Sequence, residues 1–399
     1  MSETPWLTIV GLGEDGPEGL SPASLEALAQ ADIIMGASRH LNLLPDLTGS
    51  KITWPVPFAD GLPILLSHRG SQVVMLASGN PFWFGGGSVI TRYLKPKEWR
   101  ALPAPSAMSL AAAALGWPLE RTQCFGLHAN PFAQLRPHLF PTSQILATMR
   151  DGAAVADLAT WLAAKGFGAT QIHVMEALGG LRQRIRKVSA ECFNLSDVAH
   201  PVCVGLEIVG TGSIVPLASG RPDNLFQNDG QITKRPIRAL TLSALAPCPG
   251  EHLWDIGGGS GSIAIEWLMA HPTCIATTIE VKPERAAQIC ENAAQFGVER
   301  LQVVIGSAPT VLEGLDVPNA VFIGGGISHE LLKTVWNALP SDARLVANAV
   351  TLESEALLSQ WHHSKGGELL RIELANAQPL GRKRGWSSTF PIVQWSVSK

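Results

Sequence analysis

The sequence predicts an α/β protein built from two consecutive domains, and three observations support this prediction. Short apolar strands alternate with helical segments along the chain, which is typical of α/β architectures with a mainly parallel sheet. A length of 399 residues suits two domains of about 200 residues each. The segment 210–230 is rich in Gly, Pro, Asn and Asp and lacks apolar periodicity, so we expect a linker there.

The first domain, residues 1–209, is expected to contain two lobes with a break near residues 120–150. Ser21 followed by Pro22 predicts the start of a helix, because serine caps a helix N-terminus and proline fits its first turn. An Ala-rich helix is expected to follow Ser106, and a longer helix lies in the second lobe at 153–165. Strands are expected at 7–10, 33–35 and 73–77 in the first lobe and at 172–175 and 202–209 in the second.

The second domain, residues 231–399, shows the same alternation of strands and helices. Its helices are expected at 238–245, 263–269 and 284–296, and Gly297 ends the last of these. Its strands are expected at 253–256, 277–280, 303–305, 320–323 and 344–348, followed by two final runs, 368–374 and 392–397, that a loop rich in Gly, Arg and Lys joins.

Composition limits the classes of function. With 46% hydrophobic and 16% charged residues the chain is globular rather than disordered. The net charge of −3 provides no broad basic field, so we expect no nucleic-acid partner. The six cysteines form no CxxC pair, and no metal or redox cofactor is expected. We find no signal peptide and no apolar run of about 18 residues, which predicts a cytoplasmic protein without membrane contact. The twelve tryptophans are interpreted as packing residues.

A glycine cluster in the second domain indicates a nucleoside site. Gly257, Gly259 and Gly261 lie between an expected strand and an expected helix, where glycine lets a ligand touch the main chain. Glu280 ends the next strand, near the spacing of about 20 residues expected of a ribose-binding carboxylate. Ser262 stands where G-x-G-x-x-G would require its third glycine. A small nucleoside therefore fits this loop better than a dinucleotide does.

The segment Trp254–Gly261 resembles motif I of class I S-adenosylmethionine methyltransferases. The wider block, from Asn228–Arg235 to Asn348–Glu353, is similar to the decarboxylating precorrin methyltransferases of cobalamin synthesis, and the resemblance covers residues 228–399. It implies a Rossmann-like fold whose final strand is antiparallel. It also implies that S-adenosylmethionine contacts Gly257, Gly259 and Gly261 with its methionine end, Glu280 with its ribose, Ser307 and Ala308 near its adenine, and in addition Gln231, Thr233, Asp255 and Gly324.

The first domain carries a second resemblance. Gly11-Leu12-Gly13, together with Leu76–Pro81 and Pro105–Met108, resembles the tetrapyrrole methylase family, over about residues 6–209. The family has a two-lobed fold that binds S-adenosylmethionine between its lobes, and it usually has Asp where this chain has Asn80. The resemblance implies a second cofactor site at Gly11, Gly13, Ser78, Gly79, Asn80, Pro81, Ser106, Ala107 and Leu178.

Together the two resemblances imply one S-adenosylmethionine site per domain and a precorrin substrate. The implied activity is C-methylation of the macrocycle at positions 5 and 15, with loss of carbon dioxide from the acetate side chain on ring C, in cobalamin biosynthesis. The family resemblance also suggests a homo-oligomer. Two alternatives stay open: a methyltransferase with an RNA or protein acceptor, and a catalytic second domain served by a first domain that only docks substrate.

Basic residues are the candidates for binding the carboxylates of a precorrin. Guanidinium groups pair well with carboxylates. Because the final strand is expected to be antiparallel, the loop before it should lie over the carboxyl end of the sheet, where ligands bind. The candidates are Lys234 and Arg235 before the first helix of the second domain, and Arg382, Lys383 and Arg384 in that loop.

Overall fold

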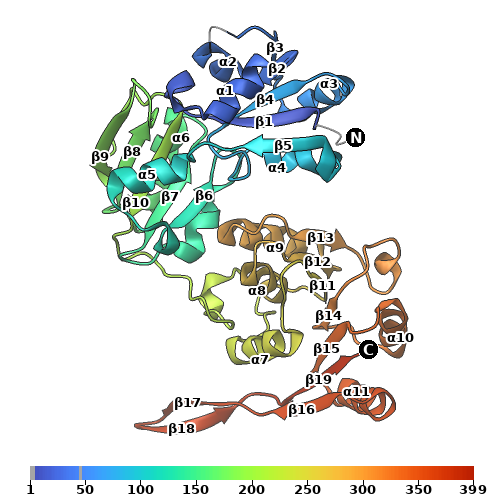
Figure 1. Ribbon diagram of the computed structural model, residues 1–399. Helices are drawn as coiled ribbons and strands as arrows, with labels where there is room; N and C mark the ends of the chain where they lie inside the picture. The colour runs from blue at the N-terminus through green and yellow to red at the C-terminus, as the bar shows by residue number, and fades with distance from the viewer. Residues whose placement is uncertain (1–4, 45–46) are drawn as a thin grey trace. The chain divides into compact units, whose positions relative to one another are not determined.

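The computed structural model describes residues 5–44 and 47–399. The chain divides into two compact units, the first made of Met1–Phe132 and His138–Ser213 and the second of Ala133–Pro137 and Ile214–Lys399. Both units contain sheets and helices, so the predicted α/β class is confirmed (Figure 1). Within the described ranges, no helix is both long and apolar enough to cross a membrane.

The first lobe of the N-terminal unit is a parallel five-stranded sheet of order β3-β2-β4-β1-β5. Apolar residues fill both faces of this sheet, one under α1 and α2 and the other under α3 and α4. Ser21 accepts a hydrogen bond from the Ser24 N–H, as its predicted capping role requires. The elements are β1 (Leu7–Leu12), α1 (Pro22–Ala29), β2 (Ile33–Gly36), α2 (Ser38–Leu43), β3 (Ser50–Thr53), α3 (Gly61–Ser67), β4 (Val73–Ser78), α4 (Gly87–Ile90), β5 (Trp99–Leu102) and α5 (Ala107–Leu115).

The second lobe differs from the mainly parallel sheet that the sequence predicted. Its order is β6-β7-β10-β8-β9, and only the β6–β7 pair is parallel. The connection 177–183 between β8 and β9 is too short for a parallel crossover, which needs about a dozen residues or more. The elements are β6 (Gln123–Gly126), β7 (Gln144–Thr148), α6 (Gly152–Ala164), β8 (Gln171–Glu176), β9 (Arg184–Ser189) and β10 (Val202–Glu207).

The C-terminal unit is built on a seven-stranded sheet of order β13-β12-β11-β14-β15-β19-β16. The last strand, β19, is antiparallel to both of its neighbours, as predicted. The elements are α7 (Arg235–Leu245), β11 (His252–Ile256), α8 (Ser262–Ala270), β12 (Ile275–Glu280), α9 (Pro283–Phe296), β13 (Gln302–Ile305), β14 (Ala320–Ile323), α10 (His329–Ala338), β15 (Arg344–Ala349), α11 (Leu352–Lys365), β16 (Glu368–Ile372) and β19 (Ile392–Ser398).

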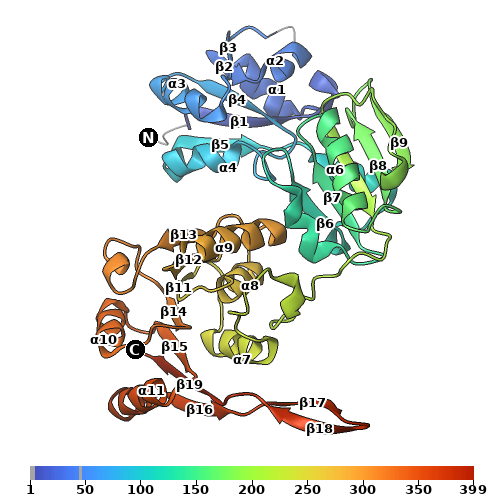
Figure 2. The same cartoon turned by 180° about the vertical axis from the view of Figure 1, so that it is seen from behind.

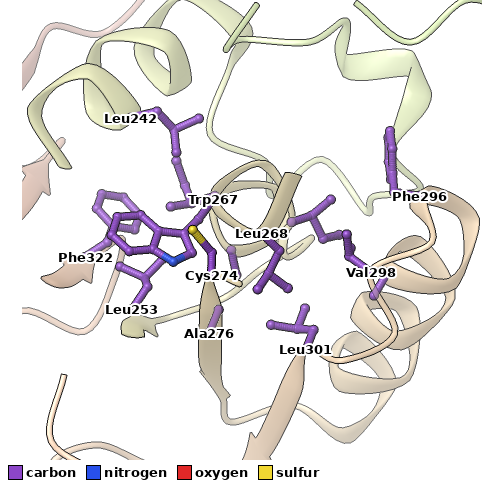
Figure 3. Close-up of a cluster of buried hydrophobic side chains, with 14 of the residues drawn as sticks. Leu242, Leu253, Trp267, Leu268, Cys274, Ala276, Phe296, Val298, Leu301 and Phe322 are labelled. Carbon is purple, nitrogen blue, oxygen red and sulfur yellow. The ribbon is translucent and has the colours of Figure 1, made fainter. Parts of the chain in front are cut away.

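Successive residues of the central strands of this sheet face two separate cores. Leu253 packs with the residues of α7, α8 and α9, whereas its neighbour Trp254 packs with those of α10 and α11. Figure 3 shows the first of these cores, with Trp267 of α8 close to Leu253 and Phe322 from the strands. A parallel sheet covered on both faces in this way leaves the carboxyl ends of its strands as the open edge for a ligand.

The expected loop between the last two strands of the sheet is instead a two-stranded ribbon. Strands β17 (Ala375–Leu380) and β18 (Lys383–Ser388) pair only with each other. They leave the carboxyl edge of the sheet between β16 and β19 and project away from it in both views (Figures 1 and 2). Neither strand of this segment contains a β-branched residue, and each has a single large apolar side chain, so the strand signal in the sequence is weak there.

Most of the predicted linker belongs to the C-terminal unit. Val215, Leu225 and Phe226 are buried in its core. A buried ionic network holds the same segment: Glu266 accepts hydrogen bonds from the backbone N–H groups of Gly220 and Arg221 at 2.8 and 2.9 Å. The linker was predicted from the high glycine and proline content of this segment. Its packing against the C-terminal unit depends instead on the few apolar residues that it contains.

Arg238 is the centre of this network and is completely buried. Its Nε donates to Glu266 at 2.7 Å, and its Nη2 pairs with Asp223 at 3.0 Å. The same guanidinium contacts the carbonyl oxygens of Arg221 and Thr233. The ion pair between Arg238 of α7 and Glu266 of α8 therefore attaches the segment 220–233 to these two helices.

We expect Glu266→Ala to destabilise the C-terminal unit by about 3–5 kcal/mol, because it removes the only fully buried carboxylate that the described residues pair with the buried Arg238 and leaves it the partly exposed Asp223. Chemical denaturation followed by tryptophan fluorescence measures this loss. Glu291→Ala, which removes an exposed carboxylate from α9, is the control and should leave stability nearly unchanged. Equal stability of the two variants would contradict the structural importance of the network.

Candidate functional site

The N-terminal unit contains a cavity of about 680 Å³ that both lobes line. It is bounded by the carboxyl ends of β1 and β4, by the start of α5 and by residues of the second lobe. Six of the residues predicted to bind a cofactor line it, namely Gly13, Ser78, Gly79, Ser106, Ala107 and Leu178. Residues up to 165 positions apart in the sequence thus line the same cavity, whose volume is that of a small-molecule site.

Close backbone packing shapes this cavity. A Cβ atom on Gly11 would lie 1.9 Å from the Gly79 carbonyl oxygen, so only glycine allows β1 and the turn after β4 to approach. Gly79 itself has a φ of +50°. Asn80 accepts a hydrogen bond from the Phe82 N–H at 2.9 Å, and Pro81 packs beneath Gly85. Gly11, Asn80 and Pro81 therefore shape the turn and do not line the cavity themselves.

A charged cluster that the sequence analysis did not single out also lines the cavity. Arg39 forms an ion pair with Glu14, which also accepts from Arg182 at 3.0 Å. Arg39 donates further to Ser78 Oγ at 2.8 Å. Two cations around one carboxylate leave a net positive charge. Burial and the neighbouring Arg39 lower the pKa of His40 to about 3, so its imidazole is neutral.

In the C-terminal unit the predicted glycine loop lies at the carboxyl edge of the sheet. Gly257 has a φ of +81°, and a Cβ atom on it would lie 3.0 Å from the Gly325 nitrogen. Gly324 donates its N–H to the Ile256 carbonyl at 2.9 Å. The turn after β14 and the glycine loop after β11 are thus in direct contact, and this contact is made by backbone.

Glu280 connects the ends of the neighbouring strands. It is 5% exposed, and its two carboxylate oxygens accept the N–H groups of Gly259 at 2.9 Å and Lys282 at 3.0 Å. Asp255 is buried beside it. Complete burial raises the pKa of Asp255 to about 7, against the opposing effect of hydrogen bonds from the Ala264 N–H and the Thr278 hydroxyl.

The segment 227–233 packs over the glycine loop. The Gln231 carbonyl oxygen lies 3.1 Å from the position of a Cβ atom on Gly259. Asn292, which is fully buried, donates to the carbonyls of Gln227 and Ser260 and accepts from the Gln227 N–H, each at 2.9 Å. Sequence reasoning missed Asn292, because a single asparagine within a helix carries no distinguishing pattern.

The remaining predicted residues are distributed unequally. Ser307 and Ala308 follow β13, where the Gly306 N–H donates to the Glu280 carbonyl at 3.0 Å, so they lie at the same edge as the glycine loop. Thr233 lies on the segment that Arg238 holds. Lys234 and Arg235 are exposed at the start of α7. Arg382, Lys383 and Arg384 lie at the tip of the β17–β18 ribbon and not over the carboxyl edge, because the ribbon projects away from it (Figures 1 and 2).

The strand order of the C-terminal unit and its glycine loop define a Rossmann-like methyltransferase, preceded by a two-lobed unit with its own cavity. Residues 224–399 match the family described as "Precorrin methyltransferase domain", and residues 6–192 match "Tetrapyrrole (Corrin/Porphyrin) Methylases". The chain is 49% identical to the Precorrin-6Y C(5,15)-methyltransferase [decarboxylating] of Sinorhizobium sp over 99% of this chain and 97% of the relative. The chain belongs to this family of decarboxylating precorrin-6Y methyltransferases, for which S-adenosylmethionine is the methyl donor.

Two shorter relatives from Salmonella typhimurium (strain LT2) each match about half of the chain. The Cobalt-precorrin-7 C(5)-methyltransferase is 28% identical and covers 50% of this chain and 98% of its own length. The Cobalt-precorrin-6B C(15)-methyltransferase (decarboxylating) is 29% identical and covers 44% of this chain and 95% of its own length.

We expect Glu280→Ala to weaken S-adenosylmethionine binding to the chain by about 1–3 kcal/mol, because a buried hydrogen-bonding acceptor is lost. Calorimetric titration of the full chain with S-adenosylmethionine measures this loss of affinity. Glu291→Ala should bind as the unaltered chain does. An unchanged titration of the Glu280 variant would show that this carboxylate does not contact the cofactor.

Proposed function

We propose that the chain transfers methyl groups from S-adenosylmethionine to positions 5 and 15 of a precorrin and releases carbon dioxide from the acetate side chain on ring C, in cobalamin biosynthesis. The observation that carries this proposal is the 49% identity to a decarboxylating precorrin-6Y methyltransferase along essentially the whole length of both chains. The shared length includes both units, so the chain has the parts for two transfers.

The two transfers divide between the units. The N-terminal unit methylates position 5, and the C-terminal unit methylates position 15 and carries out the decarboxylation. The two Salmonella relatives support this division, because each is named for one of the two activities and matches about half of this chain.

Each unit has its own S-adenosylmethionine site. In the N-terminal unit the cofactor binds in the cavity against Gly13, Gly79 and Leu178, and Ser106 and Ala107 offer the start of α5. In the C-terminal unit the glycine loop holds the methionine end, and Glu280 holds the ribose with the lone pairs that its two backbone hydrogen bonds leave free. Gln231 closes the site from the other side of the loop.

The chemistry in the C-terminal unit needs positioning more than acid or base catalysis. The turn Gly324–Gly326 offers backbone and no side chain at the edge where the ligands meet. A reduced tetrapyrrole has nucleophilic, enamine-like bridging carbons, so alignment of the carbon with the sulfonium methyl group provides most of the acceleration. The conjugated macrocycle accepts the electron pair when the acetate loses carbon dioxide. Lys234 and Arg235 bind carboxylates of the macrocycle.

In the N-terminal unit the charged cluster supports the same substrate class. Arg39 and Arg182 share one carboxylate, Glu14, and Arg39 lines the cavity. A precorrin carries many carboxylates, and the two guanidinium groups around the single carboxylate of Glu14 leave this cluster with an excess positive charge that attracts it.

We expect Gly259→Val to stop the reaction at a singly methylated product that keeps its acetate. A β-branched side chain at a φ of +57° next to the Gln231 carbonyl blocks the cofactor in the C-terminal unit only. Mass spectrometry of the product and capture of carbon dioxide measure the outcome. Gly250→Val is the matched control, since Gly250 also has a positive φ but faces open space. Two methyl transfers by the Gly259 variant would contradict the division between units.

We propose further that the β17–β18 ribbon binds a second copy of the chain. A two-stranded ribbon without other support is marginally stable in water. On the ribbon, the side chains of Leu380 and Trp386 are 70% and 80% exposed. Phe390, in the segment that leads from the ribbon to β19, is 86% exposed. Large apolar side chains of this kind mark a surface that is covered in an assembly. The basic tip, Arg382–Arg384, is then presented to the neighbouring copy and binds carboxylates of the substrate there.

Trp386→Ser is expected to lower the average mass of the protein in sedimentation experiments, because the ribbon loses its largest apolar contact. Leu217→Ser provides the control, since Leu217 is 71% exposed but lies outside the ribbon. A protein that sediments as a monomer before any substitution would contradict self-association.

A further inference from the structure

The loop after β4 presents two aromatic side chains to the cavity of the N-terminal unit. Trp83 is 50% exposed and Phe84 is 48% exposed, and both line the cavity. Their rings are perpendicular, with centroids 6.1 Å apart. Of the twelve tryptophans, Trp83 and Trp386 are the two that are exposed; Trp83 lines the cavity, as does the buried Trp54, whereas Trp386 does not. When a ligand covers half-exposed rings of this kind, the burial of their apolar surface favours binding.

Backbone geometry fixes the position of these rings. Phe84 has a φ of +55°, a left-handed conformation that is strained for a bulky residue and persists only where the surroundings enforce it. The Phe84 ring lies against Gly126 of β6, where a Cβ atom would come within 2.9 Å of the ring. A Cβ atom on Gly85 would lie 2.6 Å from the Pro81 carbonyl oxygen, so the loop is tightly wound. The Phe84 ring is therefore held in place before any ligand binds, and the Trp83 ring stands edge-on to it.

Other apolar side chains extend the same wall of the cavity. The rings of Trp54 and Phe58 are stacked, with centroids 4.7 Å apart, and the Phe58 ring lies 2.7 Å from the position of a Cβ atom on Gly86. Val56 beside them is 95% exposed and also lines the cavity. The result is a broad apolar surface next to the loop that carries Trp83 and Phe84.

We infer that Trp83 and Phe84 form a shelf that binds the face of the precorrin macrocycle during the transfer to position 5. This inference rests on the proposed function. A conjugated macrocycle has a wide apolar face that packs on aromatic rings, whereas its carboxylates require the charged cluster around Arg39. The predicted cofactor residues that line the cavity are mostly glycine and small side chains, including Ser78 and Gly79 just before this loop segment, whereas Trp83 and Phe84 offer large rings. The shelf is thus a specificity determinant for the substrate.

The test compares Trp83→Ala and Phe84→Gly in the full chain, with a reduced precorrin and isotopically labelled S-adenosylmethionine. Glycine at position 84 adopts the positive φ without strain, so this variant removes the ring and keeps the loop. Each variant is expected to raise the apparent KM for the precorrin in methylation at position 5 about three- to tenfold, the loss typical of an aromatic contact. The dissociation constant of S-adenosylmethionine should stay unchanged.

Phe82→Ala is the matched control. Phe82 lies on the same loop and is 42% exposed, but it packs against Trp99 and does not line the cavity. Its KM should equal that of the unaltered chain. Gly126→Ala, which displaces the Phe84 ring without removing it, should raise the KM in the same direction.

Three results would overturn the shelf while the proposed function stands: an unchanged KM in both ring variants, an equal rise in Phe82→Ala, or a loss of cofactor affinity that accounts for the rise. The last would assign the rings to the adenine of S-adenosylmethionine. Failure of the unaltered chain to methylate the precorrin at all would overturn the proposed function and the shelf together.

Discussion

Close approach of one backbone segment to another is the constraint on which both candidate sites depend. In the N-terminal unit the strand end at Gly11 touches the turn at Gly79, and in the C-terminal unit the loop at Gly257 touches Gly325. A Cβ atom on Gly11 would lie 1.9 Å from the Gly79 carbonyl oxygen, and one on Gly257 would lie 3.0 Å from the Gly325 nitrogen, so a side chain at either position would force the two segments apart. Glycine removes that obstacle, so that main chain without side chains faces the carboxyl edge, where ligands bind in such folds.

The two units build on this constraint differently. In the C-terminal unit, the segment 227–233, which precedes the sheet in sequence, packs over the glycine loop. Arg238 hydrogen-bonds to the Thr233 carbonyl, and Asn292 hydrogen-bonds to the carbonyls of Gln227 and Ser260. A buried ion pair in a Rossmann-like core is costly to desolvate, and it is compensated here because Glu266 also accepts two backbone N–H groups. The N-terminal unit instead uses two lobes: charged and aromatic residues of the first lobe and apolar residues of the second, such as Met175 and Leu178, line one cavity.

Local patterns predicted the elements that carry a strong signal. The capped helix after Ser21, the helix Ala107–Leu115 and the strand before the glycine loop all appear as expected. Strand β9 was missed, since its sequence Arg-Ile-Arg-Lys-Val-Ser is too charged to indicate burial. It is held by Glu176, a buried carboxylate of β8 that pairs with Arg184 and Arg186. The partner that stabilises this strand lies on another strand, which single-sequence periodicity does not register.

The sequence by itself determined the two-domain α/β class, the glycine loop with its acidic partner and the turn residues of the first lobe, because strand ends and tight turns constrain residue type locally. Only the tertiary structure decided which side chains share a space. It brought Arg39 to Glu14 and Arg182, turned Trp83 and Phe84 toward a cavity, and carried Arg382–Arg384 away from the sheet on a ribbon. These contacts join residues far apart in the chain, and their positions follow from packing between sheets and lobes, which no local pattern encodes.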